Sequence, residues 1–223
     1  MPRRYLALAL VAAAGAAAAI VAVTLASGGS EPPAPTAASG LVDGFYGPTA
    51  PPSMRAIDFS LRDDAGQMIH LRNYAGEPVV LVFIDSICKA VCPVVGEQLR
   101  GTLGELHRPV PVIALSVDPT VDTRAHVRRF LAAADLSGRV LYIAGPRRAL
   151  APIWRFFGIE SQLPIASRSA NFSLDIELLD KTGKPRVGYT ELNQLDPDLI
   201  AHDIETLTQE PMPRTAPRRV ELP

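Results

Sequence analysis

The sequence has few of the residues from which metal arrays and charged binding surfaces are built. Two cysteines and four histidines occur among 223 residues. There is no second cysteine pair and no histidine array at zinc-finger spacing, so a structural zinc site is disfavoured. Lys and Arg together number 22 and Asp and Glu 23, which gives a formal net charge of −1. This balance leaves no electrostatic footprint for nucleic acid, and the sequence shows no internal repeat.

A long apolar run opens the chain. Arg3 and Arg4 precede an almost unbroken stretch of Ala, Val and Leu from residue 5 to residue 26. The stretch exceeds the ~7–15 apolar residues of a cleaved signal peptide, and a bilayer needs about 20. We therefore expect residues 1–27 to form a single-pass signal anchor in the cell membrane, with the N-terminus in the cytoplasm. The alternative is a long signal peptide cut near Ala26, and both place the rest of the chain on the extracytoplasmic side.

Composition divides the remainder of the chain into three parts. Residues 28–53 are rich in Gly, Ser, Pro, Ala and Thr. Such a segment buries too little apolar surface to order itself, so we expect a flexible tether. Residues 54–209 have the size of one domain with a full core. Residues 210–223 are rich in Pro and Arg, which predicts a disordered tail.

Apolar patterning within residues 54–209 predicts strands and helices in alternation, with a hairpin and a helix at the end. This order indicates an α/β domain with a thioredoxin-like fold: a central mixed sheet, helices on both faces and an N-terminal hairpin extension. The predicted strands lie within residues 56–71, 79–84, 110–117, 139–143 and 173–189, and the predicted helices follow Pro93 or cover 122–134, 147–157 and 196–209.

The two cysteines lie together in one short loop. Cys88 and Cys92 follow the apolar strand expected over residues 79–84, and a helical pattern opens at Pro93. The N–H groups of a helix N-terminus, together with Lys89, favour a thiolate there. The three-residue gap can bring the two Cα atoms within the ~4.4–6.8 Å that a disulfide requires. When reduced, the same pair offers two soft sulfur ligands of the kind that select Cu(I).

Redox chemistry, soft-metal binding and a purely structural disulfide are all open for this pair. A disulfide that closes so short a loop removes little chain entropy, which favours a working pair over a structural one. Asp118, at the end of the strand over 110–117, is a candidate for assisting proton transfer at the thiols, with helix capping as the alternative. The aromatic residues of 154–157 are expected in the core, with a docking surface as the alternative.

Several motifs resemble the Sco/SenC family of membrane-anchored, thioredoxin-fold proteins. They cover nearly the whole predicted domain, and the resemblance implies the family's fold for it. The matching segments are FSLRDDAG at 59–66, GEPVVLVF at 76–83, the Cys-x-x-x-Cys-Pro of 88–93, ALSVDPTVDT at 114–123 and LLDKTG at 178–183.

The resemblance also implies a metal site, and the chain departs from it. Family members bind copper through two cysteines, matched here by Cys88 and Cys92, and one histidine. The histidine position aligns with Phe172, in Asn171-Phe172-Ser173, and Lys89 stands where the family usually has proline. A phenyl ring cannot bind copper, so the third ligand is missing at this position. We expect the remaining histidines to be surface residues rather than substitutes: His70, His107, His126 and His202.

The function implied by the resemblance is assembly of the copper centre of cytochrome c oxidase. Family members deliver copper, reduce the cysteines of their target, or do both. The expected partner is therefore a respiratory oxidase subunit or another exported cysteine-containing protein. One alternative is an extracytoplasmic thiol–disulfide oxidoreductase that works without copper, which leaves open whether the protein is an enzyme. Another is a partner-binding domain with an idle disulfide.

Overall fold

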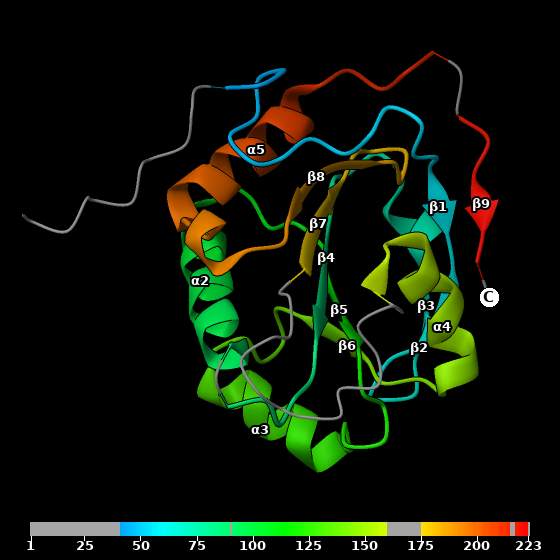
Figure 1. Cartoon of the computed structure of the whole chain (residues 1–223), viewed down its shortest axis with the longest axis vertical. Coiled ribbons are helices and arrows are strands. Elements are labelled where there is room, and N and C mark those ends of the chain that lie inside the picture. The colour runs from blue at the N-terminus through cyan, green and yellow to red at the C-terminus, as the bar shows by residue number, and fades with distance from the viewer. Residues whose placement is uncertain (1–40, 90, 160–174, 215–216, 223) are drawn as a thin grey trace, which may run out of the picture. The chain divides into compact units, whose positions relative to one another are not determined.

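The computed structural model describes residues 41–222, with gaps at residue 90 and at residues 160–174 and 215–216 (Figure 1). The predicted membrane anchor, residues 1–27, and the first part of the predicted tether lie outside the described residues. Within the described part of the chain, no helix is both long enough and apolar enough to cross a membrane.

A five-stranded mixed sheet, in the order β6-β5-β4-β7-β8, forms the centre of the domain. Strand β4 (Val79–Ile84) runs parallel to β5 (Val112–Ser116), which runs parallel to β6 (Leu141–Ile143). On its other side β4 pairs antiparallel with β7 (Asp175–Leu179), and β7 pairs antiparallel with β8 (Pro185–Tyr189). The predicted mixed sheet is therefore confirmed, with parallel strands on one side of β4 and antiparallel strands on the other.

Strand β4 is buried along its whole length. All six of its residues are apolar and at most 3% exposed. Side chains alternate between the two faces of a strand, so β4 contributes to two separate cores. Val80, Val82 and Ile84 enter one core, and Val79, Leu81 and Phe83 enter the other.

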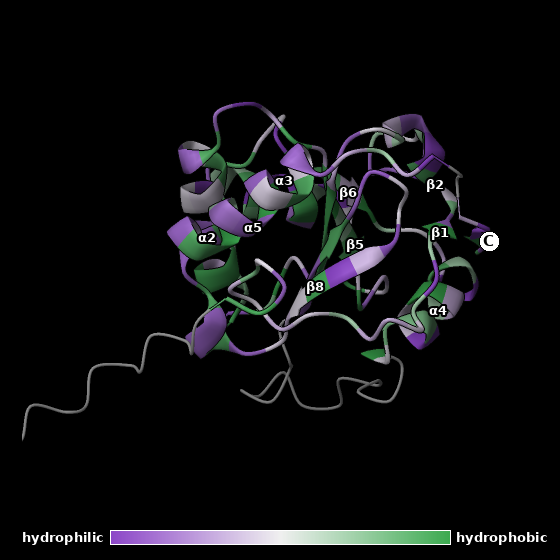
Figure 2. Ribbon diagram, turned by 90° about the horizontal axis from the view of Figure 1, so that it is seen from above, coloured by the Kyte–Doolittle hydropathy of each residue, from purple (hydrophilic) through white to green (hydrophobic). Residues whose placement is uncertain are grey.

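Helices cover both faces of the sheet (Figure 2). Helices α2 (Cys92–Glu105), α3 (Arg124–Ala133) and α5 (Pro197–Gln209) supply apolar side chains to the core that contains Val80. Helix α4 (Arg147–Phe156) supplies Leu150, Ile153 and Trp154 to the opposite core. The predicted arrangement of helices on both faces is thus confirmed.

The N-terminal extension packs on the same face as α4. It consists of β1 (Ile57–Asp58), the antiparallel hairpin β2 (Ser60–Arg62) and β3 (Met68–His70), and the short helix η1 (Leu71–Tyr74). The expected hairpin is present. Its apolar residues close the second core over the sheet, and they include Ile57, Phe59, Leu61, Ile69 and Leu71.

Residues 41–53 belong to the folded domain, so the prediction of a flexible tether is wrong for them. Phe45 is 1% exposed and lies in the core beneath α5. The backbone N–H groups of Tyr46 and Gly47 each donate to the Asp203 carboxylate of α5 at 2.9 Å, and the Tyr189 hydroxyl donates at 2.6 Å. Because Asp203 is fully buried, these three donors compensate the loss of its hydration.

The C-terminal residues also return to the domain, so the prediction of a disordered tail is wrong where the structure describes it. Strand β9 (Val220–Glu221) pairs in parallel with β1. The Arg72 guanidinium donates to the Glu221 carboxylate at 3.1 Å, and Leu222 packs against the core of the extension. This strand could not be predicted from composition, because its partner strand lies more than 150 residues away in the sequence.

Two buried carboxyl groups lie next to each other on β7. Asp175 and Glu177 are two residues apart, on the same face of the strand, and are 6% and 9% exposed. Asp175 Oδ1 and Glu177 Oε2 have no hydrogen-bond partner. Burial raises the pKa of both groups, and the negative charge of Asp175 raises the pKa of Glu177 further.

We expect Glu177→Gln to stabilise the protein at pH 8. Because the pKa is raised on folding, the folded state keeps a proton that the unfolded state releases above about pH 4, so the free energy of unfolding falls as the pH rises. Glutamine cannot ionise and removes this loss. Thermal melts should show a Tm increase of about 3 °C or more at pH 8 and a smaller change at pH 5. An equal change at both pH values would contradict the expectation, and the exposed Glu97→Gln is the control.

Candidate functional site

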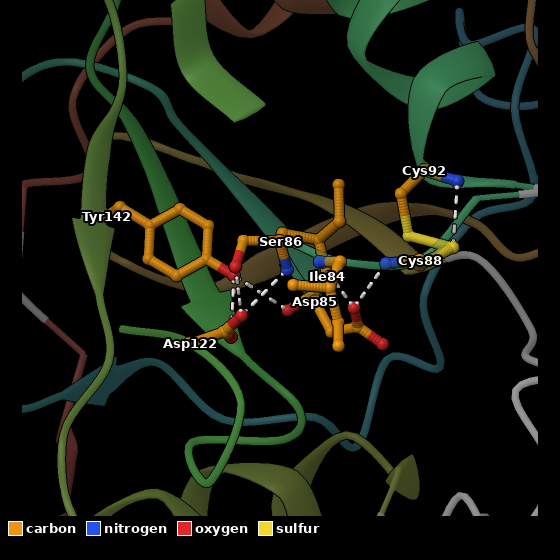
Figure 3. Close-up of a disulfide and its surroundings, with 8 residues drawn as sticks. Ile84, Asp85, Ser86, Cys88, Cys92, Asp122 and Tyr142 are labelled. Carbon is orange, nitrogen blue, oxygen red and sulfur yellow. Dashed lines mark hydrogen bonds between the residues drawn. A yellow bond between two sulfur atoms is a disulfide. The ribbon is translucent and has the colours of Figure 1, made fainter. Parts of the chain in front are cut away.

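The two cysteines meet where the chain leaves β4 and enters α2 (Figure 3). Cys88 and Cys92 form a disulfide, with their Cα atoms 5.6 Å apart. Cys92 is the first residue of α2, and Pro93 follows in the first turn, where a missing backbone N–H breaks no helical hydrogen bond. The expectation that this spacing allows a disulfide is confirmed.

The two sulfurs differ in their environments. Cys92 is 1% exposed and belongs to the core, whereas Cys88 is only partly buried. The backbone N–H of Cys92 donates to Cys88 Sγ at 3.1 Å. An N–H group at a helix N-terminus stabilises negative charge on the atom it faces. Cys88 is therefore the sulfur that a partner can reach, and its thiolate is the one that the helix favours.

A buried carboxylate holds the backbone in front of Cys88. Asp85 directly follows β4 and is 5% exposed. Its Oδ1 accepts hydrogen bonds from the backbone N–H groups of Ile87, at 2.8 Å, and Cys88, at 2.6 Å. Burial raises the pKa of Asp85, the two N–H groups lower it, and the nearby charges of Asp122 and Asp118 raise it. The net direction is upward.

A second buried carboxylate, Asp122, holds the start of the loop. Its Oδ1 accepts from the Ser86 backbone N–H at 2.7 Å and from the Ser86 hydroxyl at 2.5 Å. The Tyr142 hydroxyl of β6 donates to Asp122 Oδ2 at 2.7 Å. Burial, followed by the charge of Asp122, raises the pKa of Tyr142 well above its usual value, so the phenol stays protonated and remains a donor.

The helix predicted over residues 122–134 begins at Arg124, and Asp122 does not cap it. The residue before α3 is Thr123, whose hydroxyl accepts from the His126 backbone N–H at 3.3 Å. Asp122 instead reaches across to the thiol loop. Sequence reasoning missed the roles of Asp85, Ser86 and Tyr142, although an acidic residue directly after six apolar residues was a visible signal for the first of them.

The other sequence candidates have partners elsewhere or lie in the core. The Asp118 carboxylate accepts from Thr120, at 3.2 Å from the backbone N–H and 2.5 Å from the hydroxyl. Trp154 is fully buried, and its indole N–H donates to the Ser116 carbonyl at 3.0 Å. The Phe157 ring packs against Phe83 in a tilted arrangement, with ring centroids 5.2 Å apart. The aromatic residues of α4 and the turn after it therefore serve the core, as expected.

No third metal ligand accompanies the cysteines in the described part of the chain, where no group of three or more His, Cys, Asp and Glu side chains can hold a metal ion. Phe172, at the position aligned with the family's histidine, lies outside the described residues. Each histidine has contacts of its own: His70 with Ser60, His107 with Glu205, His126 with the Val121 carbonyl and His202 with the Gly44 carbonyl.

Comparison with known proteins decides the family. The model of the SCO1/SenC family matches residues 48–209, which include the whole sheet and the disulfide. The chain belongs to the SCO1/SenC family. The protein SCO2 homolog, mitochondrial, of Bos taurus is 29% identical over 107 residues. That alignment covers 46% of this chain and 40% of the bovine protein, so less than half of the curated relative is matched.

Solved Sco structures confirm the thioredoxin-like α/β fold. Yeast Sco1 with copper bound superposes with a TM-score of 0.59 at 18% identity, over 74% of this chain and 98% of that one. BsSco, a Sco-family cytochrome c oxidase assembly protein in which a disulfide switch has been identified, gives 0.57 at 19% identity. The superposition covers 72% of this chain and 97% of BsSco. At these identities the likeness carries the fold alone.

We expect the Cys88 thiol of the reduced protein to react with iodoacetamide at least about tenfold faster than the Cys92 thiol, because it is accessible and has the stabilised thiolate. Mass spectrometry of peptides from a quenched time course measures both rates. The same experiment in denaturant is the control, since the two thiols should then react alike. Equal rates in the folded protein would contradict the asymmetry.

Proposed function

We propose that this SCO1/SenC-family protein is a membrane-anchored assembly factor that handles copper and thiol redox while the copper centre of cytochrome c oxidase is assembled. The observation that carries the proposal is the Cys88–Cys92 pair, joined at the N-terminus of α2 with one accessible sulfur. Two fold relatives support it, because yeast Sco1 has been solved with copper bound and BsSco belongs to the oxidase assembly proteins.

The thiol chemistry proceeds by exchange through a mixed disulfide. A partner thiolate attacks Cys88 Sγ, the bond to Cys92 breaks, and Cys92 leaves as a thiolate that takes a proton from solvent. A second partner thiolate then attacks the partner sulfur of the mixed disulfide. The partner gains a disulfide, and Cys88 leaves and is protonated in turn. The reverse sequence reduces the partner and restores the Cys88–Cys92 bond.

Copper is cargo in this proposal, and the cysteines meet only part of its needs. When reduced, Cys88 and Cys92 offer two thiolates on one short loop, a donor set that suits Cu(I). The described residues add no third ligand. We therefore assign completion of the copper coordination to the partner during transfer, and the partner to a respiratory oxidase subunit or another exported cysteine-containing protein.

The apolar segment at residues 1–27 supports a location of this protein at the membrane. The apolar run within residues 1–27 is long enough to span a bilayer, and two arginines precede it. We propose that it anchors the protein in the cell membrane and that residues 28–40 connect it to the domain on the extracytoplasmic side. Since residues 41–53 pack into the domain, the connecting tether is shorter than composition alone indicates.

Replacing the cysteines tests the proposed role. In cells whose oxidase assembly depends on this protein, we expect Cys88→Ser and Cys92→Ser each to lower oxidase activity and oxidase-bound copper to nearly the level of cells without the protein. Ala65→Ser, in the exposed hairpin turn, is the control and should restore both. Normal oxidase in the cysteine variants would overturn the proposal and leave a binding domain with an idle disulfide.

A second candidate is a thiol–disulfide oxidoreductase that works on exported proteins without holding copper. It is favoured by the lack of a third ligand among the described residues and by Phe172 at the position aligned with the family's histidine. The disulfide and the accessible Cys88 serve this candidate equally well. Only a measurement of copper binding separates the two.

An anaerobic Cu(I) titration of the reduced full-length protein against a competing chelator makes that separation. One tightly bound copper that protects both thiols supports copper handling, and free thiols with no competitive binding support the oxidoreductase. We expect Phe172→His to raise the affinity by at least about tenfold, the size of effect that even an outer-shell partner has. Phe172→Leu is the matched control, and no gain with histidine would mean that residue 172 is not at the copper site.

A further inference from the structure

The buried carboxylate of Asp85 has its hydrogen-bond partners in the thiol loop. Its two hydrogen bonds are accepted from the backbone N–H groups of Ile87 and Cys88. Among the described residues no cation lowers its pKa, and the charges that act on it are those of Asp122 and Asp118, which are negative. Burying a carboxylate without a paired cation is costly. The bonds that offset this cost hold the backbone of the first cysteine.

Cys88 is held at two points as a result. Its backbone N–H is bound by Asp85 at 2.6 Å, and its sulfur receives the Cys92 N–H at 3.1 Å. The first contact comes from the end of β4 and the second from the first residue of α2. Figure 3 shows the Asp85 carboxylate between the Asp122–Ser86 contacts and the cysteines. Asp122 therefore holds the beginning of the loop, and Asp85 holds the cysteine itself.

Hydrogen bonding, rather than charge, is the means by which Asp85 can fix this cysteine. Both bonds end on a single oxygen, Oδ1, so a neutral amide with its oxygen in the same place can also accept both. The charge itself lies against the backbone of Cys88, whose thiolate form it would disfavour. A positioning role thus predicts that Asn replaces Asp85 well and that Ala does not.

We propose that Asp85 is the positioning residue of the thiol pair. Its hydrogen bonds to the backbone N–H groups of Ile87 and Cys88 hold Cys88 where its sulfur meets Cys92 and so favour closure of the disulfide. The inference rests on the proposed function in one respect, that Cys88 and Cys92 are working thiols. It concerns this chain's own loop and does not depend on copper.

The equilibrium with glutathione measures this positioning. The protein dithiol reacts with oxidised glutathione to give the protein disulfide and two molecules of reduced glutathione. One S–S bond breaks, one forms, and the two thiol protons pass to glutathione. The equilibrium constant rises with the effective concentration of one protein thiol at the other, so it falls if Cys88 is released from its position.

The test compares the full-length protein with Asp85→Ala and Asp85→Asn in glutathione buffers. Loss of both hydrogen bonds in Asp85→Ala should lower the constant for disulfide closure about tenfold, which raises the reduction potential by about 30 mV. Asp85→Asn should stay close to the wild type. Asp118→Asn is the matched control, because it removes a charge from the same edge of the sheet without touching the loop N–H groups, and it should leave the constant unchanged.

Two results would overturn the proposal. One is an Asp85→Ala constant equal to that of the wild type. The other is an equal shift in Asp85→Ala and Asp85→Asn, which would assign the effect to charge. If thermal melting shows that Asp85→Ala is unfolded, Asp85→Leu fills the same space without an acceptor and should give the same tenfold decrease. Failure of the cysteine variants to affect the oxidase would overturn the proposed function without changing this equilibrium, so the two failures are distinguishable.

Discussion

Strand β4 is buried on both faces, and this burial dictates how the neighbouring strands and helices are placed. Its six side chains enter two cores, and its backbone is paired with β5 on one side and β7 on the other. The first polar residue after the strand is Asp85, which begins the thiol loop. Helix α2 returns over the sheet from that point, which brings the N-terminal N–H groups of the helix to Cys88.

Among the described residues, Asp203, Asp122 and Asp85 are buried carboxylates that hold backbone or hydroxyl donors, whereas buried Asp58 pairs with the Arg72 guanidinium. Asp203 ties the N-terminal segment to α5 and β8. Asp122 connects the thiol loop to β6, because it accepts hydrogen bonds from Ser86 in the loop and from Tyr142 in β6. Asp85, at the start of the loop, accepts a hydrogen bond from the backbone N–H of Cys88. A buried carboxylate that loses such donors is costly, so these contacts resist rearrangement. The segment from Asp85 to Cys88 is therefore held rigidly at the end of β4.

The family membership and the departure at Phe172 bear on different parts of the function. The proposed exchange chemistry uses the disulfide and the position of the thiols at the start of α2, and it needs no third ligand. Copper handling needs an additional donor that the described residues do not contain. A protein with this arrangement is suited to thiol redox in its own right, and a partner that brings its own ligands would extend it to copper.

Sequence patterns predicted the order of strands and helices, the central place of residues 79–84, the thioredoxin-like class and the position of the thiols. These depend on local periodicity and on apolar runs, which can be read within a window of ten or fifteen residues. Tertiary structure alone decided that Asp122 serves Ser86 while Thr123 caps α3, that Cys92 is buried and Cys88 accessible, and that both ends of the domain fold back. The physical reason is that a buried polar group is satisfied by whichever donor the fold brings to it: Gly47 and Asp203, which share such a hydrogen bond, are 156 residues apart in the chain.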